Sequence, residues 1–196
     1  MLKTTDELRV ELQEYSNVLT KISRMVTHGE LVPIKKGYYE TDKNANPLAI
    51  SSVVYGPSYI SFQKALGIYN MIPEKVVAIT CATCSKNRQK KFSNAFGEFL
   101  YRDVPIEVFP YGLNTVVDGE YRYQIATKEK AVLDMLYIVP PVKTIKALKE
   151  LLFEDLRIEE ELFFELDFEF MEEAARLYKT NNHNLLIKFL RRQKHD

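Results

Sequence analysis

The polar side chains between residues 17 and 28 are of the kinds that contact DNA. Apolar residues recur there at helical spacing, and the opposite side of the predicted helix, residues 18–28, carries no acid. That side holds Asn17, Thr20, Arg24, Thr27 and His28, with Lys21 on its flank. Short amide and hydroxyl side chains can reach base edges, and an arginine can bridge guanine through two hydrogen bonds. The segment therefore predicts a helix that enters the major groove of DNA.

Lys35 and Lys36 follow that helix at a position suited to phosphate contact. Gly29 ends the predicted helix, residues 31–34 are apolar enough for a short strand, and residues 38–39 begin the returning strand. The two lysines occupy the turn between these strands. Cations at a hairpin tip hold a protein on the DNA backbone without reading its sequence. We therefore expect Lys35 and Lys36 to bind phosphate.

A second group of cations falls in a predicted loop further along the chain. Its members are Lys86, Arg88, Lys90 and Lys91. Charged loops often serve binding, so we interpret these residues as a secondary, nonspecific contact with the DNA backbone beside the first surface. A solvated surface is the alternative interpretation for every charged stretch of this chain.

Cys81 and Cys84 form a C-x-x-C pair after a predicted strand. Such a pair can carry thiol redox chemistry when a helix N-terminus lowers the pKa of the first thiol. The residues that follow are weak helix formers, and nothing else in the sequence favours a thioredoxin-like fold. A zinc site would need further ligands, and the histidines at 28, 183 and 195 lack the spacing for one. We expect an incidental pair and no metal site, with a thiol redox protein as the less favoured alternative.

Asp134 is a single acid within an otherwise apolar predicted helix. A catalytic carboxylate there would need a partner, and no second acid or histidine lies nearby on that face. Lys130 stands one helical turn earlier, so an ion pair is the expected role. The sequence also lacks a glycine-rich phosphate loop, a nucleophile elbow and an H-E-x-x-H motif. We therefore expect no catalytic residue, no cofactor and no enzymatic activity.

The composition is that of an ordinary globular chain. Its 196 residues are 46% hydrophobic and 28% charged, and 27 basic residues balance 27 acidic ones. This balance excludes low-complexity disorder and gives no global signal for nucleic acid or a membrane. No apolar stretch approaches the roughly 18 residues of a spanning helix, and the N-terminus shows no signal region. These two features predict that the protein has no membrane partner. Because two cysteines close together cannot staple a chain of this size, we expect a cytoplasmic protein.

The neutral total conceals stretches of opposite sign near the C-terminus. Residues 150–173 contain many acids and a single base, Arg157. Residues 176–196 contain several bases, the last of them Lys194, and a single acid, Asp196. Acidic helices can dock a basic protein partner. A protein-interaction module that does not bind DNA is therefore an alternative to the DNA-binding interpretation.

The elements that position these residues divide the chain at residue 43. Thr4 and Glu7 form a capping-box pattern ahead of one helix, Asn17 offers a cap for the second, and the hairpin follows. Helix, turn, helix and hairpin are the plan of a winged helix-turn-helix, which we assign to residues 1–43. Residues 44–47, with two Asn and a Pro, are the expected linker.

The remainder, residues 44–196, is expected to form an α+β domain. Helical patterns cover residues 48–55, 58–69 and 128–137, and strand patterns cover 76–80, 96–101, 106–111, 114–117 and 121–126. The pair at residues 118–119 is a hairpin turn between the last two strands. Helices rich in leucine and glutamate fill most of the rest. We expect a mixed, mainly antiparallel sheet followed by C-terminal helices.

Several stretches of the sequence resemble AbiEi-family antitoxins, the repressor half of a type IV abortive-infection toxin–antitoxin system. They are residues 24–31 (RMVTHGEL), 36–39 (KGYY), 59–61 with 65–66, 98–101 (EFLY), 109–112 (FPYG) and 125–137 (IATKEKAVLDMLY). The last is similar to the family's strand-to-helix signature, in which a proline commonly precedes the glutamate. Lys128 stands at that position here, which a helix tolerates because proline is only preferred there. The likeness spans residues 1–140 and is weaker beyond them.

The resemblance implies a transcriptional autorepressor that binds the operator in its own promoter through the N-terminal domain. It further implies that the C-terminal domain acts as an antitoxin and neutralises a nucleotidyltransferase-like toxin. Such proteins also occur as orphan regulators without a toxin. Neither composition nor residue spacing indicates these activities by itself.

Overall fold

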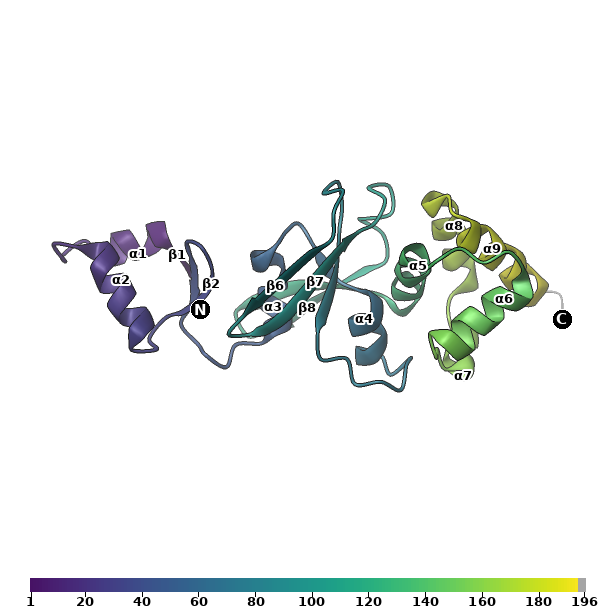
Figure 1. Ribbon diagram of the computed structural model, residues 1–196, viewed down its shortest axis with the longest axis horizontal. Helices are drawn as coiled ribbons and strands as arrows, with labels where there is room; N and C mark the ends of the chain where they lie inside the picture. The colour runs from purple at the N-terminus through teal and green to yellow at the C-terminus, as the bar shows by residue number, and fades with distance from the viewer. Residues whose placement is uncertain (194–196) are drawn as a thin grey trace.

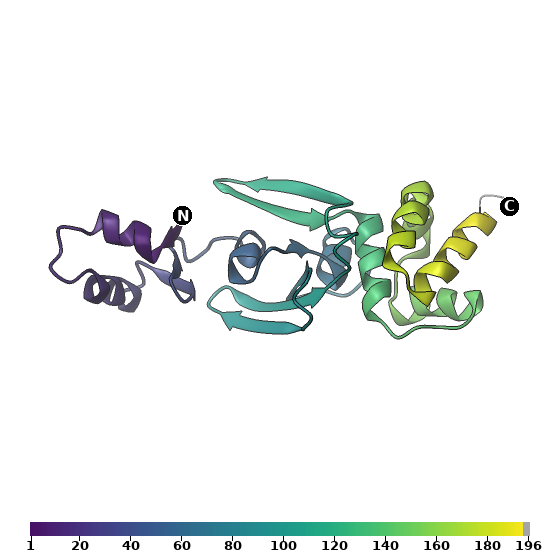
Figure 2. The same cartoon turned by 90° about the horizontal axis from the view of Figure 1, so that it is seen from above.

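The computed structural model describes residues 1–193, so that Lys194, His195 and Asp196 lie outside the described residues. A small N-terminal part, a central sheet and a group of C-terminal helices follow one another along an elongated molecule (Figure 1). The view from above shows the N-terminal part set apart from the sheet at one end (Figure 2). Helices and strands together make the chain an α+β protein.

The N-terminal part combines a pair of short helices with a small sheet. Its elements are β1 (Leu2–Thr4), α1 (Thr5–Glu11), α2 (Val18–Thr27), β2 (Val32–Lys35) and β3 (Tyr38–Glu40). The strands pair antiparallel in the order β1-β3-β2. Helix α2 and the β2–β3 hairpin lie where the sequence predicts them, and α1 begins at its predicted cap. The sequence does not predict β1, because its 3 residues are too few to show a period.

Both helices begin at the caps that the sequence predicts. The Thr4 side chain accepts a hydrogen bond from the Glu7 N–H at 3.2 Å, and the Glu7 carboxylate accepts one from the Thr4 N–H at 2.7 Å. The Asn17 carboxamide oxygen accepts from the Thr20 N–H at 3.1 Å. These bonds satisfy N–H groups that the start of a helix leaves without an intrahelical partner.

A small hydrophobic core joins these helices to their sheet. Its buried members are Leu8, Ile22 and Leu31. Leu19 is an apolar residue of α2, yet it is 56% exposed. Tyr15, which follows α1 in the chain, is exposed as well. Because α1 already ends at Glu11, it covers only part of α2, and both side chains stay at the surface.

A mixed sheet forms the centre of the molecule, with the strand order β6-β7-β5-β4-β9-β8. Its strands are β4 (Tyr59–Ile60), β5 (Ile79–Thr83), β6 (Lys90–Asn94), β7 (Gly97–Asp103), β8 (Leu113–Asp118) and β9 (Tyr121–Ala126). The β5–β7 and β4–β9 pairs are parallel, and the other neighbours are antiparallel. Helices α3 (Pro47–Val54), α4 (Phe62–Ile68) and α5 (Lys128–Ile138) contact the sheet. Seen from above, the β6–β7 and β8–β9 hairpins stand apart with α3 between them (Figure 2).

One predicted strand of this region is wrong. Residues 106–111 form successive turns, with the Phe109 N–H bonded to the Ile106 carbonyl at 3.3 Å. Strand β7, which precedes them, already lies between β6 and β5. No edge of β7 is therefore open to a strand that would return beside it.

The ends of other elements differ from the predicted ones. Residues 59–60 form strand β4, so the helix predicted over 58–69 is the shorter α4. Strand β5 begins at Ile79 rather than at residue 76. Lys90 and Lys91 belong to strand β6 rather than to a loop. Pairing with strands that are distant in the sequence sets these ends, and local residue patterns do not reveal this pairing.

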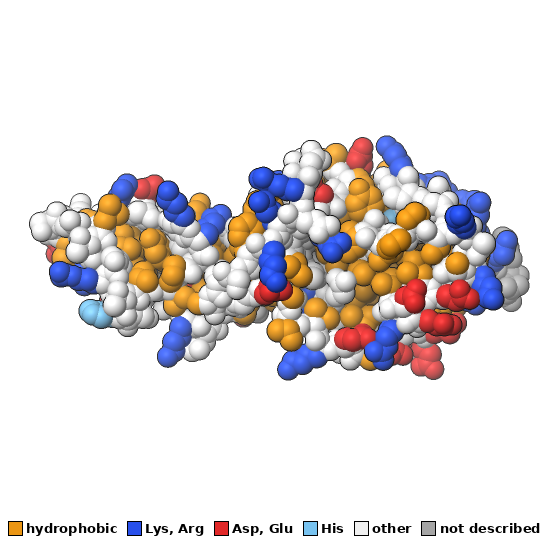
Figure 3. All heavy atoms as spheres, in the orientation of Figure 1, with side chains coloured by type: hydrophobic (Ala, Val, Ile, Leu, Met, Phe, Trp, Pro, Cys, Tyr) orange, Lys and Arg blue, Asp and Glu red, His pale blue; other side chains and the backbone are white. Residues whose placement is uncertain are grey.

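The C-terminal helices share the core of the central part. They are α6 (Ile145–Glu150), the π-helix η1 (Leu151–Asp155), α7 (Glu160–Phe164), α8 (Phe168–Tyr178) and α9 (Asn181–Gln193). Helix α5 contacts α8 and α9, so it links the sheet to these helices. Acidic side chains gather along one edge of this region (Figure 3). No helix within residues 1–193 combines the length and apolarity that crossing a membrane requires.

The N-terminal part contacts the sheet through a short polar junction. The Asn94 side chain, at the end of β6, donates a hydrogen bond to the Ile34 carbonyl at 3.1 Å. The Asn46 side chain, in the segment that leads from the N-terminal part into α3, donates to Asp118 at 2.7 Å. Ile34 also belongs to the large hydrophobic cluster of the central part. The division at residue 43 stays a prediction, because the larger core reaches across it.

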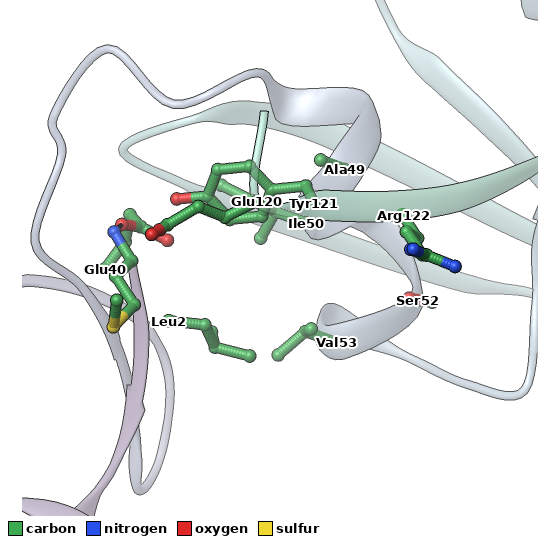
Figure 4. Close-up of a pocket in the computed structure, with 10 residues that line it drawn as sticks. Leu2, Glu40, Ala49, Ile50, Ser52, Val53, Glu120, Tyr121 and Arg122 are labelled. Carbon is green, nitrogen blue, oxygen red and sulfur yellow. Dashed lines mark hydrogen bonds and ion pairs between the residues drawn. The ribbon is translucent and has the colours of Figure 1, made fainter. Parts of the chain in front are cut away.

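A pocket opens beside this junction, between the N-terminal sheet, α3 and the β8–β9 hairpin (Figure 4). Its lining residues are Met1, Leu2, Glu40, Ala49, Ile50, Ser52, Val53, Glu120, Tyr121 and Arg122. Leu2 and Val53 face each other across it, and Tyr121 lies close to Glu40 (Figure 4). Burial and the neighbouring Glu40 carboxylate raise the pKa of Tyr121. None of the residues predicted to contact DNA lines this pocket.

Candidate nucleic-acid interface

The predicted DNA-contacting side of α2 lies at the molecular surface. Asn17, Thr20, Arg24, Thr27 and His28 are exposed, and Lys21 is half-buried. The opposite side of the helix packs on the small core through Ile22. Most of the polar side lines a depression together with Tyr15 and Ser16. Because apolar and polar residues follow the helical period, burial of one side leaves the other facing solvent.

Some polar side chains of α2 already have partners within the protein. Asn17 caps the helix, and the Thr27 hydroxyl donates to the Ser23 carbonyl at 3.0 Å. The Lys21 ammonium lies 5.1 Å from the centre of the Tyr15 ring, which is a cation–π contact. These contacts hold the side chains on the exposed side of the helix.

Arg24 is the cation of α2 that is most available to a ligand. Among residues 1–193 it has neither a carboxylate nor an aromatic ring as a partner. The Nδ1 atom of His28 lies 3.7 Å from a Glu30 carboxylate oxygen, and the two pair only when the ring is protonated. Helix α2 itself contains no acid. The positive charges of Lys21 and Arg24 are therefore not offset on their own helix.

The β2–β3 hairpin presents Lys35 and Lys36 at the surface, as predicted. The Lys35 ammonium lies 4.6 Å from the centre of the Tyr38 ring. The Thr5 N–H donates to the Gly37 carbonyl at 2.9 Å, so the tip of the hairpin is tied to the start of α1. Gly37 has a φ of 82°, which a glycine adopts without steric cost.

The second basic group, residues 86–91, does not adjoin this surface. The Lys86 ammonium lies 5.4 Å from the centre of the Tyr55 ring. Lys91 forms an ion pair with Glu98 at 2.5 Å. Lys90 begins strand β6, whereas the opposite end of β6 contacts the N-terminal part. The group therefore lies in the β5–β6 loop and at the end of β6 that is away from the N-terminal part.

Cys81 and Cys84 are free thiols, and both are buried. Cys81 lies within strand β5 rather than at the start of a helix. Burial raises the pKa of Cys81 to about 12, and burial together with the charge of Asp103 raises the pKa of Cys84. Both environments disfavour the thiolate, which is the reactive form of cysteine.

A buried polar network surrounds Asp134 on α5. The predicted ion pair with Lys130 is confirmed at 2.7 Å, and neither side chain is exposed. The carboxylate also accepts hydrogen bonds from Tyr59, Ser61 and Tyr178. Burial lowers the pKa of Lys130, although the neighbouring carboxylate opposes this shift. These side chains have almost no exposed surface, and their hydrogen bonds hold α5 against its neighbours.

His183 of α9 joins the same region, although the sequence places no histidine near Asp134. Its ring stacks on Tyr178 with the ring centres 4.1 Å apart, and Nε2 lies 3.0 Å from the Leu133 carbonyl. Burial lowers the pKa of His183 to about 4. The signal in the sequence was the Lys130–Asp134 pair within an apolar helix, but its other partners come from β4, the start of α4 and α8.

The described residues hold no cluster of three His, Cys, Asp or Glu side chains suited to a metal ion. No known family model matches the chain, and no curated protein matches it. The exposed cationic side of α2 and the lysines of the hairpin are basic features at the surface of the N-terminal part.

Proposed function

We propose that this chain is a DNA-binding transcriptional autorepressor and the antitoxin of a type IV toxin–antitoxin system, similar to the AbiEi family. The N-terminal part binds the operator in the protein's own promoter, with α2 in the major groove and the β2–β3 hairpin on the backbone. The remainder neutralises a nucleotidyltransferase-like toxin. The observation that carries the proposal is the exposed, acid-free polar side of α2, which is followed by two exposed lysines at a hairpin tip.

The topology of the N-terminal part supports a winged helix-turn-helix. The α1–α2 pair is inserted between β1 and the β2–β3 hairpin, and β3 pairs with both other strands. The bond between Thr5 and Gly37 fixes the hairpin relative to the helices. A hairpin held in this way can contact phosphates while α2 occupies the groove.

The charges of this surface also favour DNA. Among residues 1–193, Arg24, Lys35 and Lys36 have no carboxylate partner. When cations without a competing acid contact phosphates, counterions bound to the DNA are released. This release is the main source of nonspecific affinity for DNA. Arg24 can in addition bridge a guanine edge, which gives specificity.

The antitoxin half of the proposal depends on the resemblance of residues 98–101, 109–112 and 125–137. The acids along the C-terminal helices give one edge of this half a negative charge (Figure 3). Enzymes that bind nucleotides or nucleic acids carry basic surfaces. An acidic surface is complementary to these and would speed association with such a toxin.

A mobility-shift assay on the DNA upstream of the coding sequence tests operator binding. Arg24→Ala should weaken specific binding by about 1–3 kcal/mol, because it removes a contact to a base edge. Arg9→Ala is the matched control, since Arg9 is exposed on α1 and pairs with Asp6 at 3.2 Å. If both variants bind the DNA like the unaltered protein, this surface is not the interface.

The hairpin is tested through the salt dependence of the same binding. Replacing Lys35 and Lys36 together by Ala should lower the slope of log K against log salt by about 1.8, because each phosphate contact contributes roughly 0.9. A Lys143→Ala/Lys146→Ala double variant removes the same charge far along the chain and should leave the slope unchanged. Equal slopes for the two double variants would contradict the role of the hairpin.

Toxin neutralisation is tested separately in cells. The neighbouring gene is expected to encode a nucleotidyltransferase-like toxin that arrests growth when it is expressed alone. Co-expression of the full chain with this toxin should restore growth. Operator binding without such rescue would indicate an orphan regulator, and the antitoxin half of the proposal would then be wrong.

A further inference from the structure

A hollow beside the β5–β6 loop lies in a different part of the molecule from the surface proposed for DNA. Its lining residues are Asn87, Arg88, Gln89, Arg102, Asp103, Tyr137 and Ile138. They come from the β5–β6 loop, the end of β7 and the end of α5, next to the C-terminal helices (Figure 1). Strand β6 separates the hollow from the N-terminal part, which it contacts at its other end.

Asp103, the acid of this hollow, is already bound by its own loop. Its carboxylate accepts hydrogen bonds from the Thr83 hydroxyl and from the backbone N–H groups of Lys86 and Asn87. Ser85 and Asn87 have φ angles of 57° and 53°, so the loop turns sharply around the carboxylate. Within the described chain, no arginine forms an ion pair with Asp103.

The hollow is rich in groups that bind anions. Arg88 and Arg102 line it, and among residues 1–193 neither has a carboxylate partner. The carboxamides of Asn87 and Gln89 and the hydroxyl of Tyr137 are further hydrogen-bond donors. Planar guanidinium groups match the oxygen geometry of a phosphate and can bind it through paired hydrogen bonds.

Arg102 also borders a second hollow whose lining is mostly apolar. The other residues there are Phe62, Gln63, Val76, Ala78, Thr80 and Leu100. Arg102 thus stands between a cationic site and an apolar one. A ligand that occupies both carries a phosphate and a compact ring-shaped body, which is the chemistry of a mononucleotide.

We propose that Arg88 and Arg102 bind the phosphate of a mononucleotide, whose base lies in the apolar hollow beside Leu100. Arg102 holds the phosphate from strand β7, and Arg88 holds it from the loop that Asp103 fixes in place. The site shares no residue with α2 or the β2–β3 hairpin. A failure to bind a mononucleotide would therefore leave the operator-binding proposal intact, and a failure to bind the operator would leave this site intact.

Calorimetric titration of the full-length protein with adenosine 5′-monophosphate, inorganic phosphate and adenosine tests the site. The monophosphate should bind most tightly, because it alone fills both hollows. Arg88→Gln and Arg102→Gln should each weaken it about tenfold or more, since each removes a charge-assisted contact. Arg102→Lys should retain part of the affinity, because it keeps the charge but loses the planar fork.

Lys91→Gln is the matched control. Lys91 lies on the neighbouring strand, pairs with Glu98 at 2.5 Å and does not line the hollow. Its replacement should change the affinity by less than about twofold. Equal affinities in Lys91→Gln and the two arginine-to-glutamine variants would overturn the proposal, as would the absence of binding at ligand concentrations on the order of 10 mM. Tighter binding of a short single-stranded oligonucleotide, weakened equally in all these variants, would assign the arginines to a nucleic-acid surface and overturn it as well.

Discussion

The ammonium of Lys130 lies 2.7 Å from the carboxylate of Asp134, one turn along α5, with both side chains fully buried. Tyr59 and Ser61 donate to the same carboxylate from β4 and the start of α4, at 2.9 and 2.7 Å. Tyr178 donates to it from α8 at 2.6 Å. The ion pair therefore fastens α5 both to the sheet and to the C-terminal helices.

Removing one member of this pair should destabilise the whole central part. Lys130→Met leaves the Asp134 carboxylate buried without its cation, so we expect a loss of roughly 3–5 kcal/mol in the free energy of unfolding. Urea denaturation followed by circular dichroism measures the loss. Lys146→Met is the control, because Lys146 pairs with Glu150 at the surface and should change stability by less than about 0.5 kcal/mol. Similar losses in the two variants would show that the buried pair is not needed.

His183 should make stability depend on pH. The folded chain keeps this ring neutral down to about pH 4, because burial lowers its pKa from 6.5 to about 4. Between these pH values the unfolded chain binds the proton more readily, so the free energy of unfolding decreases as the pH falls from 6.5 to 4. A difference of this size corresponds to about 3 kcal/mol.

The pH dependence is measured by urea denaturation at a series of pH values. His183→Phe keeps a ring against Tyr178 but cannot titrate, so its stability should fall less steeply over this range. His28→Gln, which replaces an exposed histidine, should retain the slope of the unaltered protein. An identical slope in His183→Phe would refute the assignment to His183.

Asn17 has a capping role that can be separated from any contact with DNA. Asn17→Ala removes the bond to the Thr20 N–H and should cost about 1 kcal/mol of local stability. Hydrogen exchange of the α2 amides should then accelerate. Asn17→Ser keeps a capping oxygen, so its exchange rates should stay close to those of the unaltered protein. If Asn17→Ser nevertheless weakens operator binding, the side chain also contacts DNA.

The thiols should not react in the folded protein. Cys81 and Cys84 are buried and their pKa values are raised, so a disulfide reagent at about pH 8 should modify neither before denaturation. After denaturation both of the 2 cysteines should react. Rapid modification of Cys84 in the native protein would revive the thiol redox alternative.

Local patterns were sufficient for the elements that carry the proposed DNA-binding surface. The capping signals at Thr4 and Asn17 and the helical period between residues 18 and 28 predict α1 and α2, and they predict that Arg24 faces solvent. The hairpin turn at residues 118–119 likewise predicts β8 and β9. Caps, periods and tight turns involve residues a few positions apart, so their energetics can be judged from the sequence.

Contacts between distant residues decided the rest. Residues 106–111 are apolar enough for a strand, but β7 has no free edge to receive one. Arg88 and Arg102 share a hollow only because the β5–β6 loop folds back on the end of β7. His183 reaches the neighbourhood of Asp134 only because α9 packs against α5. The sequence determines which segments can form helices and strands, whereas the packing of these segments decides which side chains meet, since burial free energy depends on the whole fold.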